Sequence, residues 1–281
     1  MFESSYSKQA DLAGVYNNLG CVYDALGDGR HAESFFKTSL REMSGPTNDA
    51  FLNLADHLLK ERRYEEAVPL IQTLEKEAPD SVKTLAWRVT VKYILARHYY
   101  HLKDYAKALG YLSEILAIDE KDTGAYAGIS YIFSEVREDY DDAIRILREG
   151  LAHVPKNLAL LNNLAYNYLM KGELEKGRKI LDQIDEHEAI ESTHVRGTRG
   201  LLLIKEHAIQ EGARFYNIAI RLAKDEETKA QVRQKKNLEL GRHFLGQGNK
   251  ARARKLFLEA LKIQSDSEVY RRQAEHLLRL C

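Results

Sequence analysis

The sequence contains little cysteine, little proline and no long apolar run. Its two cysteines, Cys21 and Cys281, are too few for a disulfide framework and favour a reducing compartment. With only four prolines in 281 residues, long helices are permitted. No run approaches the roughly 18 apolar residues that a membrane-spanning helix needs, and the first residues lack the basic-then-apolar layout of a signal peptide. These absences predict a soluble, cytoplasmic protein that does not use a membrane as partner.

The charge is balanced in total but uneven along the chain. The 42 Lys and Arg residues match the 42 Asp and Glu residues, and an apolar content of 44% indicates an ordered protein. From Lys229 onward there are 13 basic and 5 acidic residues, so this stretch carries +8 and the preceding residues carry −8. This asymmetry allows contact with an acidic partner or with the acidic part of a second copy.

A pattern of a small, a bulky, a second small and a second bulky residue recurs along the chain. Its first copy is Gly20, Tyr23, Ala32 and Phe36. The second small residue lies at positions 32, 67, 108, 143, 177, 212 and 253, at intervals of 35, 41, 35, 34, 35 and 41. Each copy is typical of two amphipathic helices joined by a polar turn. Small residues let the two helix backbones approach closely, which explains a glycine that costs about 1 kcal/mol inside a helix.

These residues resemble the tetratricopeptide repeat, a motif of about 34 residues with this spacing of small and aromatic positions. The resemblance extends from residue 13 to about residue 263. It implies an all-α fold, a right-handed superhelical solenoid of about seven helix pairs that forms a single domain over residues 1–281. The expected copies span 13–46, 48–81, 84–122, 123–157, 158–191, 193–226 and 228–264, and residues 267–280 are expected to form a C-terminal capping helix.

Three departures from the repeat predict local irregularity. In the fourth copy the small residues Ser130 and Ala143 are thirteen positions apart, where those of the other copies are twelve positions apart. The two intervals of 41 predict helices lengthened around Asp80–Trp87 and Ala223–Gln234. No cap comparable to the C-terminal one precedes the first copy, so we expect an uncovered N-terminal edge.

Asparagines recur where the resemblance places the concave groove, which is lined by the first helix of each pair. Asn18, Asn53 and Asn163 lie two residues before the first small residue of their copies, and Asn17 and Asn162 lie one residue earlier. An asparagine side chain can pair with both groups of a passing peptide. Asparagine ladders hold extended peptides in the family that this chain resembles. The alternative is that these asparagines tie adjacent helices together.

Aromatic and basic residues are expected in the same groove near the middle of the array. They are Tyr93, Arg97, Tyr100, Tyr131 and Tyr166. Tyrosine suits recognition because it buries a large area and keeps a hydroxyl group. We therefore predict a peptide held by the asparagines, with its apolar side chains near the tyrosines. The alternative is that several of these tyrosines pack between helices.

Residues for catalysis, for a metal or for a cofactor are not recognisable in the sequence. His98 and His101 are three residues apart on one helix, but no third ligand accompanies them at a suitable spacing, so we interpret them as surface histidines. Cys21 is interpreted as a packed thiol. The sequence therefore predicts a binding protein rather than an enzyme, with no cofactor and no metal.

The predicted function is a protein–protein interaction module that binds a peptide or a helical segment and acts as an adaptor, a scaffold or a regulatory subunit. One alternative is a homo-oligomeric scaffold that uses the uncovered N-terminal edge and the charge asymmetry. A less favoured alternative is nucleic-acid contact through the basic C-terminal repeats. Aromatic residues for base stacking are sparse there, only Phe244, Phe257 and Tyr270, and two of these serve the repeat.

Overall fold

A computed structural model describes residues 2–42, 48–61, 63–77, 85–265 and 268–281. These residues form helices and no strands, which confirms the all-α prediction. The chain divides into two compact units, Met1–Asp119 (unit 1) and Glu120–Cys281 (unit 2). The repeat boundaries, the number of repeats and the right-handed superhelix stay predictions.

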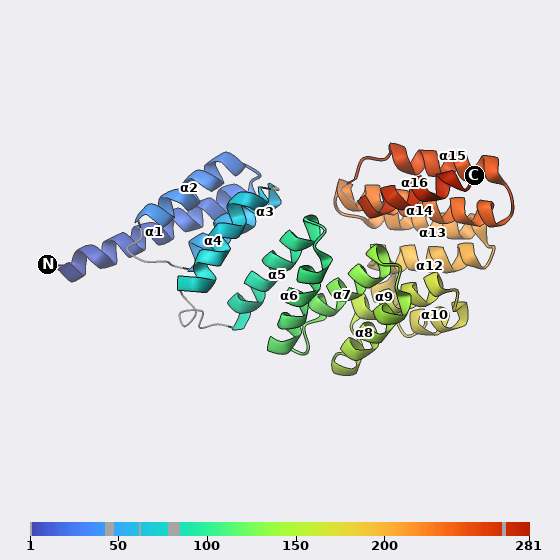
Figure 1. Cartoon of the computed structure of the whole chain (residues 1–281), viewed down its shortest axis with the longest axis horizontal. Helices are drawn as coiled ribbons and strands as arrows, with labels where there is room; N and C mark the ends of the chain where they lie inside the picture. The colour runs from blue at the N-terminus through green and yellow to red at the C-terminus, as the bar shows by residue number, and fades with distance from the viewer. Residues whose placement is uncertain (1, 43–47, 62, 78–84, 266–267) are drawn as a thin grey trace. The chain divides into compact units, whose positions relative to one another are not determined.

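Unit 1 consists of successive antiparallel helix pairs (Figure 1). Its helices are α1 (Phe2–Ala25), α2 (Gly29–Glu42), α3 (Asn48–Lys60), α4 (Tyr64–Glu77), α5 (Leu85–His101) and α6 (Tyr105–Ile118). Helix α1 packs on α2, α3 on α4 and α5 on α6, while α1, α3 and α5 also contact one another in succession. One face of unit 1 is therefore lined by α1, α3 and α5.

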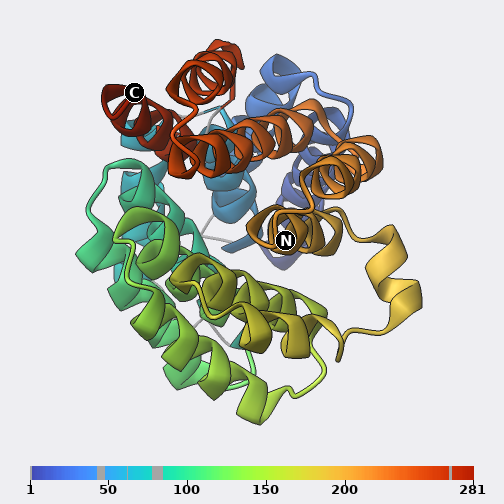
Figure 2. The ribbon, with the colours of Figure 1, turned by 90° about the vertical axis from the view of Figure 1, so that its right-hand side faces the viewer.

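Unit 2 continues the same pairing with more irregular elements. They are α7 (Thr123–Tyr131), the π-helical turn η1 (Ile132–Val136), α8 (Tyr140–His153), α9 (Leu158–Lys171), α10 (Leu174–Leu181), α11 (Glu186–Glu191), α12 (Thr193–Lys205), α13 (Ile209–Leu222), α14 (Glu226–Gly246), α15 (Lys250–Lys262) and α16 (Glu268–Arg279). Helices α7, α9, α12, α14 and α16 contact one another in succession. Figure 2 shows the helices of this unit following one another around a curve.

The small residues of the pattern lie where two paired helices approach each other. A Cβ atom added to Gly20 would lie 2.4 Å from the Phe36 ring, and one added to Gly241 would lie 2.3 Å from the Phe257 ring. Both rings are about 1% exposed or less. The glycine of the first helix therefore makes room for the bulky residue of the second, as the pattern predicts.

The turn between paired helices repeats in its backbone geometry. A residue with positive φ lies five positions before the second small residue in six of the copies: Gly27, Lys103, Glu138, Gly172, His207 and Gly248. Their φ angles are 78°, 61°, 55°, 89°, 65° and 75°. The left-handed conformation ends the first helix and redirects the chain into the second. Three copies adopt it without glycine, at a conformational cost.

Three features of unit 2 modify the regular pairing. Helix α14 has 21 residues, which confirms the lengthened helix expected around Ala223–Gln234. The other lengthened helix was expected around Asp80–Trp87, largely outside the described residues. The short helix α11 between α10 and α12 was not expected from the sequence. The extra residue of the fourth copy is accommodated in η1, where the N–H of Arg137 donates to the carbonyl of Ile132, five residues back, at 3.2 Å.

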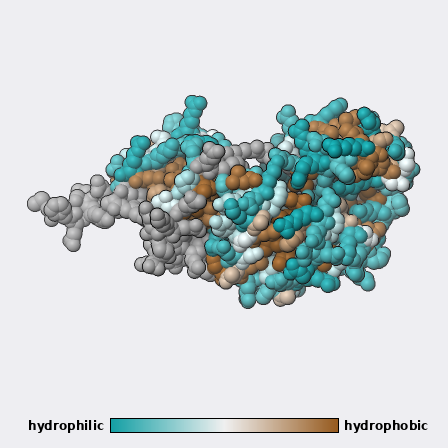
Figure 3. All heavy atoms as spheres, in the orientation of Figure 1, coloured by the Kyte–Doolittle hydropathy of each residue, from teal (hydrophilic) through white to brown (hydrophobic). Residues whose placement is uncertain are grey.

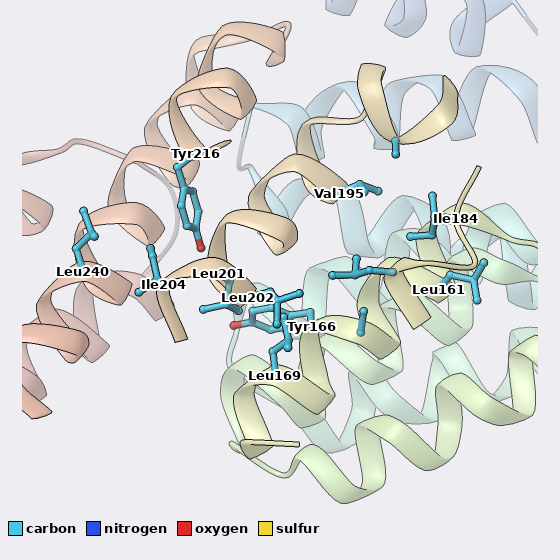
Figure 4. Packing of buried hydrophobic residues seen from close by; sticks show 13 residues of the cluster. Leu161, Tyr166, Leu169, Ile184, Val195, Leu201, Leu202, Ile204, Tyr216 and Leu240 are labelled. Carbon is cyan, nitrogen blue, oxygen red and sulfur yellow. The ribbon is translucent and has the colours of Figure 1, made fainter. Parts of the chain in front are cut away.

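Buried hydrophobic residues form separate clusters in the two units. One cluster of unit 2 extends from Leu161 on α9 to Leu240 on α14 and includes Tyr166 and Tyr216 (Figure 4). On the face of unit 2 drawn in Figure 3, hydrophilic residues surround separated hydrophobic patches. The core of unit 2 thus lies between its paired helices and positions the inner face of α9 and α12.

Candidate functional site

Unit 2 contains a cavity of about 620 Å³ on the inner face of its first helices. Helices α7, α9, α12 and α14 line it, together with η1, Tyr216 of α13 and Tyr270 of α16. This volume is in the range of ligand-binding clefts. The side chains with polar groups that line it include Ser134, Glu135, Asn162, Asn163, Tyr166, Asn167, Thr198, Tyr216, Gln231, Lys235 and Tyr270. The cavity therefore has more polar groups than the core around it, although most of its lining area is apolar.

The π-helical turn η1 supplies two of these side chains. Ser134 and Glu135 are 3% and 6% exposed, and both line the cavity. A π turn holds one residue more than an α turn and so changes the direction in which the following side chains point. The extra residue of the fourth copy therefore coincides with a turn that places a buried carboxylate, that of Glu135, at the cavity wall.

Lys235 of α14 compensates the buried charge of Glu135. The Lys235 Nζ atom lies 3.5 Å from Glu135 Oε1 and 3.6 Å from the centroid of the Tyr166 ring. Tyr166 forms a hydrogen bond with Glu135, and burial followed by the Glu135 charge raises the pKa of Tyr166 well above its usual range. The ion pair, with its cation–π contact, leaves the cavity wall without net charge from these two groups.

Four buried oxygen atoms at the cavity have no hydrogen-bond partner among the described residues. They are Ser134 Oγ, Asn162 Oδ1, Asn167 Oδ1 and the Tyr216 hydroxyl, on side chains of residues that are 3%, 6%, 2% and 1% exposed. A buried polar group without a partner costs about 1–3 kcal/mol. The partners of these four atoms, water or a ligand, are not among the described residues.

Glycines of α12 let Tyr216 reach the cavity from the second helix of its pair. A Cβ atom added to Gly200 would lie 2.9 Å from the Tyr216 ring, and one added to Gly197 would lie 3.8 Å from it. The ring therefore passes close to the α12 backbone, and Tyr216 lines the cavity although it belongs to α13. Figure 4 shows Tyr216 and Tyr166 in the same group of buried side chains.

The structure brings together the site residues that the sequence indicated in unit 2. Tyr131, Asn162, Asn163 and Tyr166 all line the cavity. Tyr131 is 38% exposed, whereas Tyr166 is 8% exposed and belongs to the core cluster. The Nδ2 group of Asn162 donates to Asn163 Oδ1 at 3.4 Å. Tyr166 thus has the packing role that was left open as an alternative, and it also forms part of the cavity wall.

The asparagines of unit 1 are in a different situation. Asn53 Nδ2 donates to Asn17 Oδ1 at 3.0 Å and to Cys21 Sγ at 3.3 Å, which joins α3 to α1. This contact corresponds to the alternative in which asparagines tie adjacent helices together. Asn18, one residue further along α1, is exposed.

The remaining indicated residues lie on α5. Arg97 Nη2 lies 3.0 Å from Asp56 Oδ1 of α3, so its charge is paired within unit 1. Tyr100 makes edge contacts with the rings of His101 and Tyr105, and Tyr93 is half-buried. The structure places these residues in unit 1 and the cavity in unit 2.

Several cavity residues were not recognised in the sequence. Ser134 and Glu135 lie in the fourth copy, whose spacing of thirteen positions predicts an irregularity. The spacing does not predict where their side chains point. Asn167 lies four residues after Asn163 on the same face of α9, so its helical spacing was a usable signal. Tyr216 is the second bulky residue of the sixth copy, so the pattern predicts only packing for it, and Lys235 lies in the basic stretch after Lys229, where the sequence shows its charge but not its contact.

The described part of the chain contains no group of three or more His, Cys, Asp or Glu side chains that could hold a metal ion. Cys21 is exposed, so its interpretation as a packed thiol is wrong, although partial burial, and then the charge of Asp24, raises the pKa of the thiol. A raised pKa lowers the fraction of reactive thiolate. No described helix is long and apolar enough to cross a membrane.

Comparisons with known proteins match two stretches of the chain to one kind of repeat. Residues 17–82 and residues 137–194 each match a family model described as tetratricopeptide repeat. The TPR repeat-containing protein YpiA of Bacillus subtilis (strain 168) is 26% identical over 193 residues, which are 65% of this chain and 43% of YpiA. The match thus spans less than half the length of that curated relative.

Solved structures show a similar fold. A tetratricopeptide repeat protein from Parabacteroides merdae superposes with a TM-score of 0.67 at 16% identity and covers 99% of this chain and 98% of its own. PilW, described as a widely conserved type IV pilus biogenesis factor, superposes with a TM-score of 0.54 at 12% identity over 82% of this chain and 99% of its own. At these identities the similarity concerns the fold alone.

Proposed function

Because this chain is a tetratricopeptide repeat protein, we propose that it binds an extended segment of a partner protein in the cavity of unit 2. Proteins of this family are typically interaction modules, and the fold does not by itself name a partner. The observation that carries the proposal is the set of four buried oxygen atoms without partners around one cavity. The role of adaptor, scaffold or regulatory subunit in the cytoplasm, rather than that of an enzyme, is part of the proposal.

The spacing of two of these oxygen atoms favours an extended segment. Asn162 and Asn167 are five residues apart on α9, so their positions differ by about 7.5 Å along the helix axis. Alternate N–H groups on one side of an extended chain are about 6.6–6.8 Å apart. This axial spacing matches that of an extended segment, which must also bridge the roughly 140° that separates the two residues around the helix.

The chemistry of the lining favours a segment that donates hydrogen bonds. The unpartnered atoms of Asn162 and Asn167 accept only, while those of Ser134 and Tyr216 can accept or donate. The charges of Glu135 and Lys235 offset each other. An acidic side chain would meet acceptors where it needs donors, so we expect uncharged or basic residues at the centre of the bound segment.

Selection from a random peptide library tests this proposal. Phage displaying random 12-residue peptides are selected on the immobilised full chain, and the enriched peptides are labelled and measured by fluorescence anisotropy. We expect Asn162→Ala and Asn167→Ala each to weaken binding about tenfold, the equivalent of one lost hydrogen bond to a buried group. Asn18→Ala is the matched control, because Asn18 is exposed and lies in unit 1.

Two outcomes would contradict the proposal. One is that no peptide is enriched above the level of an unrelated immobilised protein. The other is that enriched peptides bind Asn162→Ala, Asn167→Ala and the wild type equally well. A third comparison tests the chemistry of the lining: replacing the central residues of a bound peptide by Asp and Glu should abolish binding, and unchanged binding would refute the preference for donors.

A further inference from the structure

Helix α1 carries a row of apolar side chains that face solvent. Leu12, Val15, Val22 and Leu26 are 41%, 54%, 54% and 73% exposed, and Leu19 between them is half-buried. We call these five residues the α1 stripe. They follow one another at intervals of three, four, three and four residues, which is the heptad spacing of a helix that packs along another helix. Exposed apolar patches of this kind mark interaction sites.

The middle of the same face is covered in the next two first helices of unit 1, whereas Leu102, the counterpart of Leu26 two copies later, is 57% exposed. Ala50 and Leu54 of α3, which correspond to Val15 and Leu19 one copy later, are 1% and 2% exposed. Val91 and Leu95 of α5, two copies later, are 2% and 1% exposed. The preceding helix, α2 or α4, contacts each of these helices. The α1 stripe therefore corresponds to a helix-packing face. In α3 and α5 the helix that packs on this face is the second helix of the preceding copy, α2 or α4.

We propose that the α1 stripe packs against the α1 stripe of a second copy of this chain, with the two helices antiparallel. The stripe reads Leu, Val, Leu, Val, Leu in either direction, so two antiparallel copies present the same order of side chains to each other. A two-fold interface requires such self-complementarity. No residue of the stripe is charged, so two identical faces approach without like-charge repulsion.

The residues that flank the stripe are compatible with this arrangement. Asp11, Asn18 and Ala25 occupy equivalent positions along one side, and Asn18 and Ala25 are uncharged. Tyr16 and Tyr23 lie along the other side and stack on Phe35 of α2 within the same chain. Five side chains are fewer than the roughly 20–30 residues per partner in a standard interface. We therefore expect a weak dimer, with a dissociation constant on the order of 1–100 μM.

Sedimentation of the full chain between about 1 and 200 μM tests the proposal. We expect the mass to rise from monomer to dimer, in 0.15 M and in 1 M NaCl alike, because salt does not screen an apolar contact. The double variant Val15→Glu, Val22→Glu should remain monomeric. Leu102→Glu is the matched control, since Leu102 is 57% exposed and lies outside the stripe. It should dimerise like the wild type.

Three results would overturn the proposal: a wild type that stays monomeric at 200 μM, a double variant that dimerises normally, or a dimer that dissociates in 1 M NaCl. The orientation is tested by mixing Leu12→Cys and Leu26→Cys proteins in a background without native cysteines. Antiparallel helices predict disulfides that join one Leu12→Cys chain to one Leu26→Cys chain. Parallel helices predict disulfides that join two chains of the same variant. Circular dichroism checks that the double variant is folded. The double variant should also bind cavity peptides as the wild type does. This measurement tests the dimer proposal independently of the function proposed for unit 2.

Discussion

Tyr166 and Tyr216 are buried tyrosines of one cluster that differ in what their hydroxyl groups contact. The Tyr166 hydroxyl bonds with Glu135, whereas the Tyr216 hydroxyl has no partner among the described residues. Removing a buried hydroxyl that has no partner removes its desolvation cost. We therefore expect Tyr216→Phe to leave the free energy of unfolding unchanged or to raise it by up to about 1 kcal/mol. Tyr166→Phe should lower it by about 1–2 kcal/mol, because it withdraws a hydrogen bond from a buried carboxylate.

Chemical denaturation of the two variants measures this difference. The two substitutions are chemically identical and lie in one cluster, so each serves as the control for the other. A loss of more than about 1 kcal/mol in Tyr216→Phe would show that its hydroxyl is already satisfied in the unliganded protein. The Tyr216 hydroxyl would then not be available to bind a ligand in the cavity.

Glu33 on α2 is the anionic partner of a bidentate guanidinium contact. Its two carboxylate oxygens lie 2.6 Å and 3.0 Å from the Nη atoms of Arg63, and Lys37 is also paired with it. The Arg63 hydrogen bonds, followed by those from Lys37, lower the pKa of Glu33 to about 2. A lowered pKa stabilises the fold above the pKa of an unfolded glutamate, about 4.3, and this stabilisation is lost as the pH falls toward 2.

Glu33→Gln should therefore destabilise unit 1 by about 1–2 kcal/mol at pH 7, since Arg63 is partly exposed to solvent and the full shift is not realised. The difference from the wild type should shrink between pH 4.5 and pH 2 and vanish below it. Thermal melting across this pH range measures the difference. Glu149→Gln, at an exposed glutamate of α8, is the control. A difference that is constant with pH would exclude the ion pair as its cause.

The three asparagines at one position of the repeat show how much of the site the sequence contained. Asn18, Asn53 and Asn163 are equivalent in sequence, and all three fall on first helices as predicted. Asn53 nevertheless bonds to Asn17 of the neighbouring helix, Asn18 is exposed, and Asn163 lines the cavity. The outcome depends on which residue the adjacent copy presents. Spacing within one copy predicts the helix face, but it does not predict that neighbour.

At the scale of the elements, the turn between paired helices is the most regular feature of the chain. Glu138 and Gly172 occupy the same position of successive turns with φ of 55° and 89°. A non-glycine residue pays roughly 1–2 kcal/mol for this conformation. We expect Glu138→Gly to stabilise the protein by about 0.5–1 kcal/mol, less than that cost because glycine is also freer in the unfolded chain.

Gly172→Ala is the reverse experiment in the next turn. No atom lies within 4 Å of the position of its Cβ, so any destabilisation is conformational and not steric. We expect a loss of about 1 kcal/mol, measured like the gain in Glu138→Gly by thermal or chemical denaturation. Destabilisation in both variants would mean that contacts of the Glu138 side chain outweigh its backbone cost.

The helices followed from the sequence more closely than the cavity did. The small–bulky pattern located the paired helices because it reflects contacts inside one copy, such as Gly20 with Phe36. The cavity arises from side chains of different copies, with Glu135 from η1 meeting Lys235 from α14, one hundred residues later. The extra residue before Ala143 signalled an irregularity. The orientation of the Glu135 side chain could not be predicted from that signal, because it depends on the three-dimensional arrangement of the turn.

At the scale of the whole molecule, some buried residues form clusters that lie within a single unit, such as the cluster around Ile71 in unit 1 and the cluster around Tyr216 in unit 2. In a repeat array each copy is stabilised mainly by its neighbours, so a defect should weaken the copies around it first. Ile71 of α4 is fully buried in the cluster of unit 1. Ile71→Ala should lower the free energy of unfolding of unit 1 by about 2–5 kcal/mol.

Hydrogen exchange measured along the chain tests whether the two units lose stability separately. In Ile71→Ala we expect faster exchange in α3, α4 and α5, with unchanged exchange in α9, α12 and α13. Leu160→Ala is the mirror variant, because Leu160 is fully buried in unit 2 and should have the opposite pattern. Equal acceleration in both units would show that the chain unfolds as one cooperative body. If the units respond separately, a peptide bound in the cavity should slow exchange in unit 2 alone and should bind Ile71→Ala as tightly as the wild type.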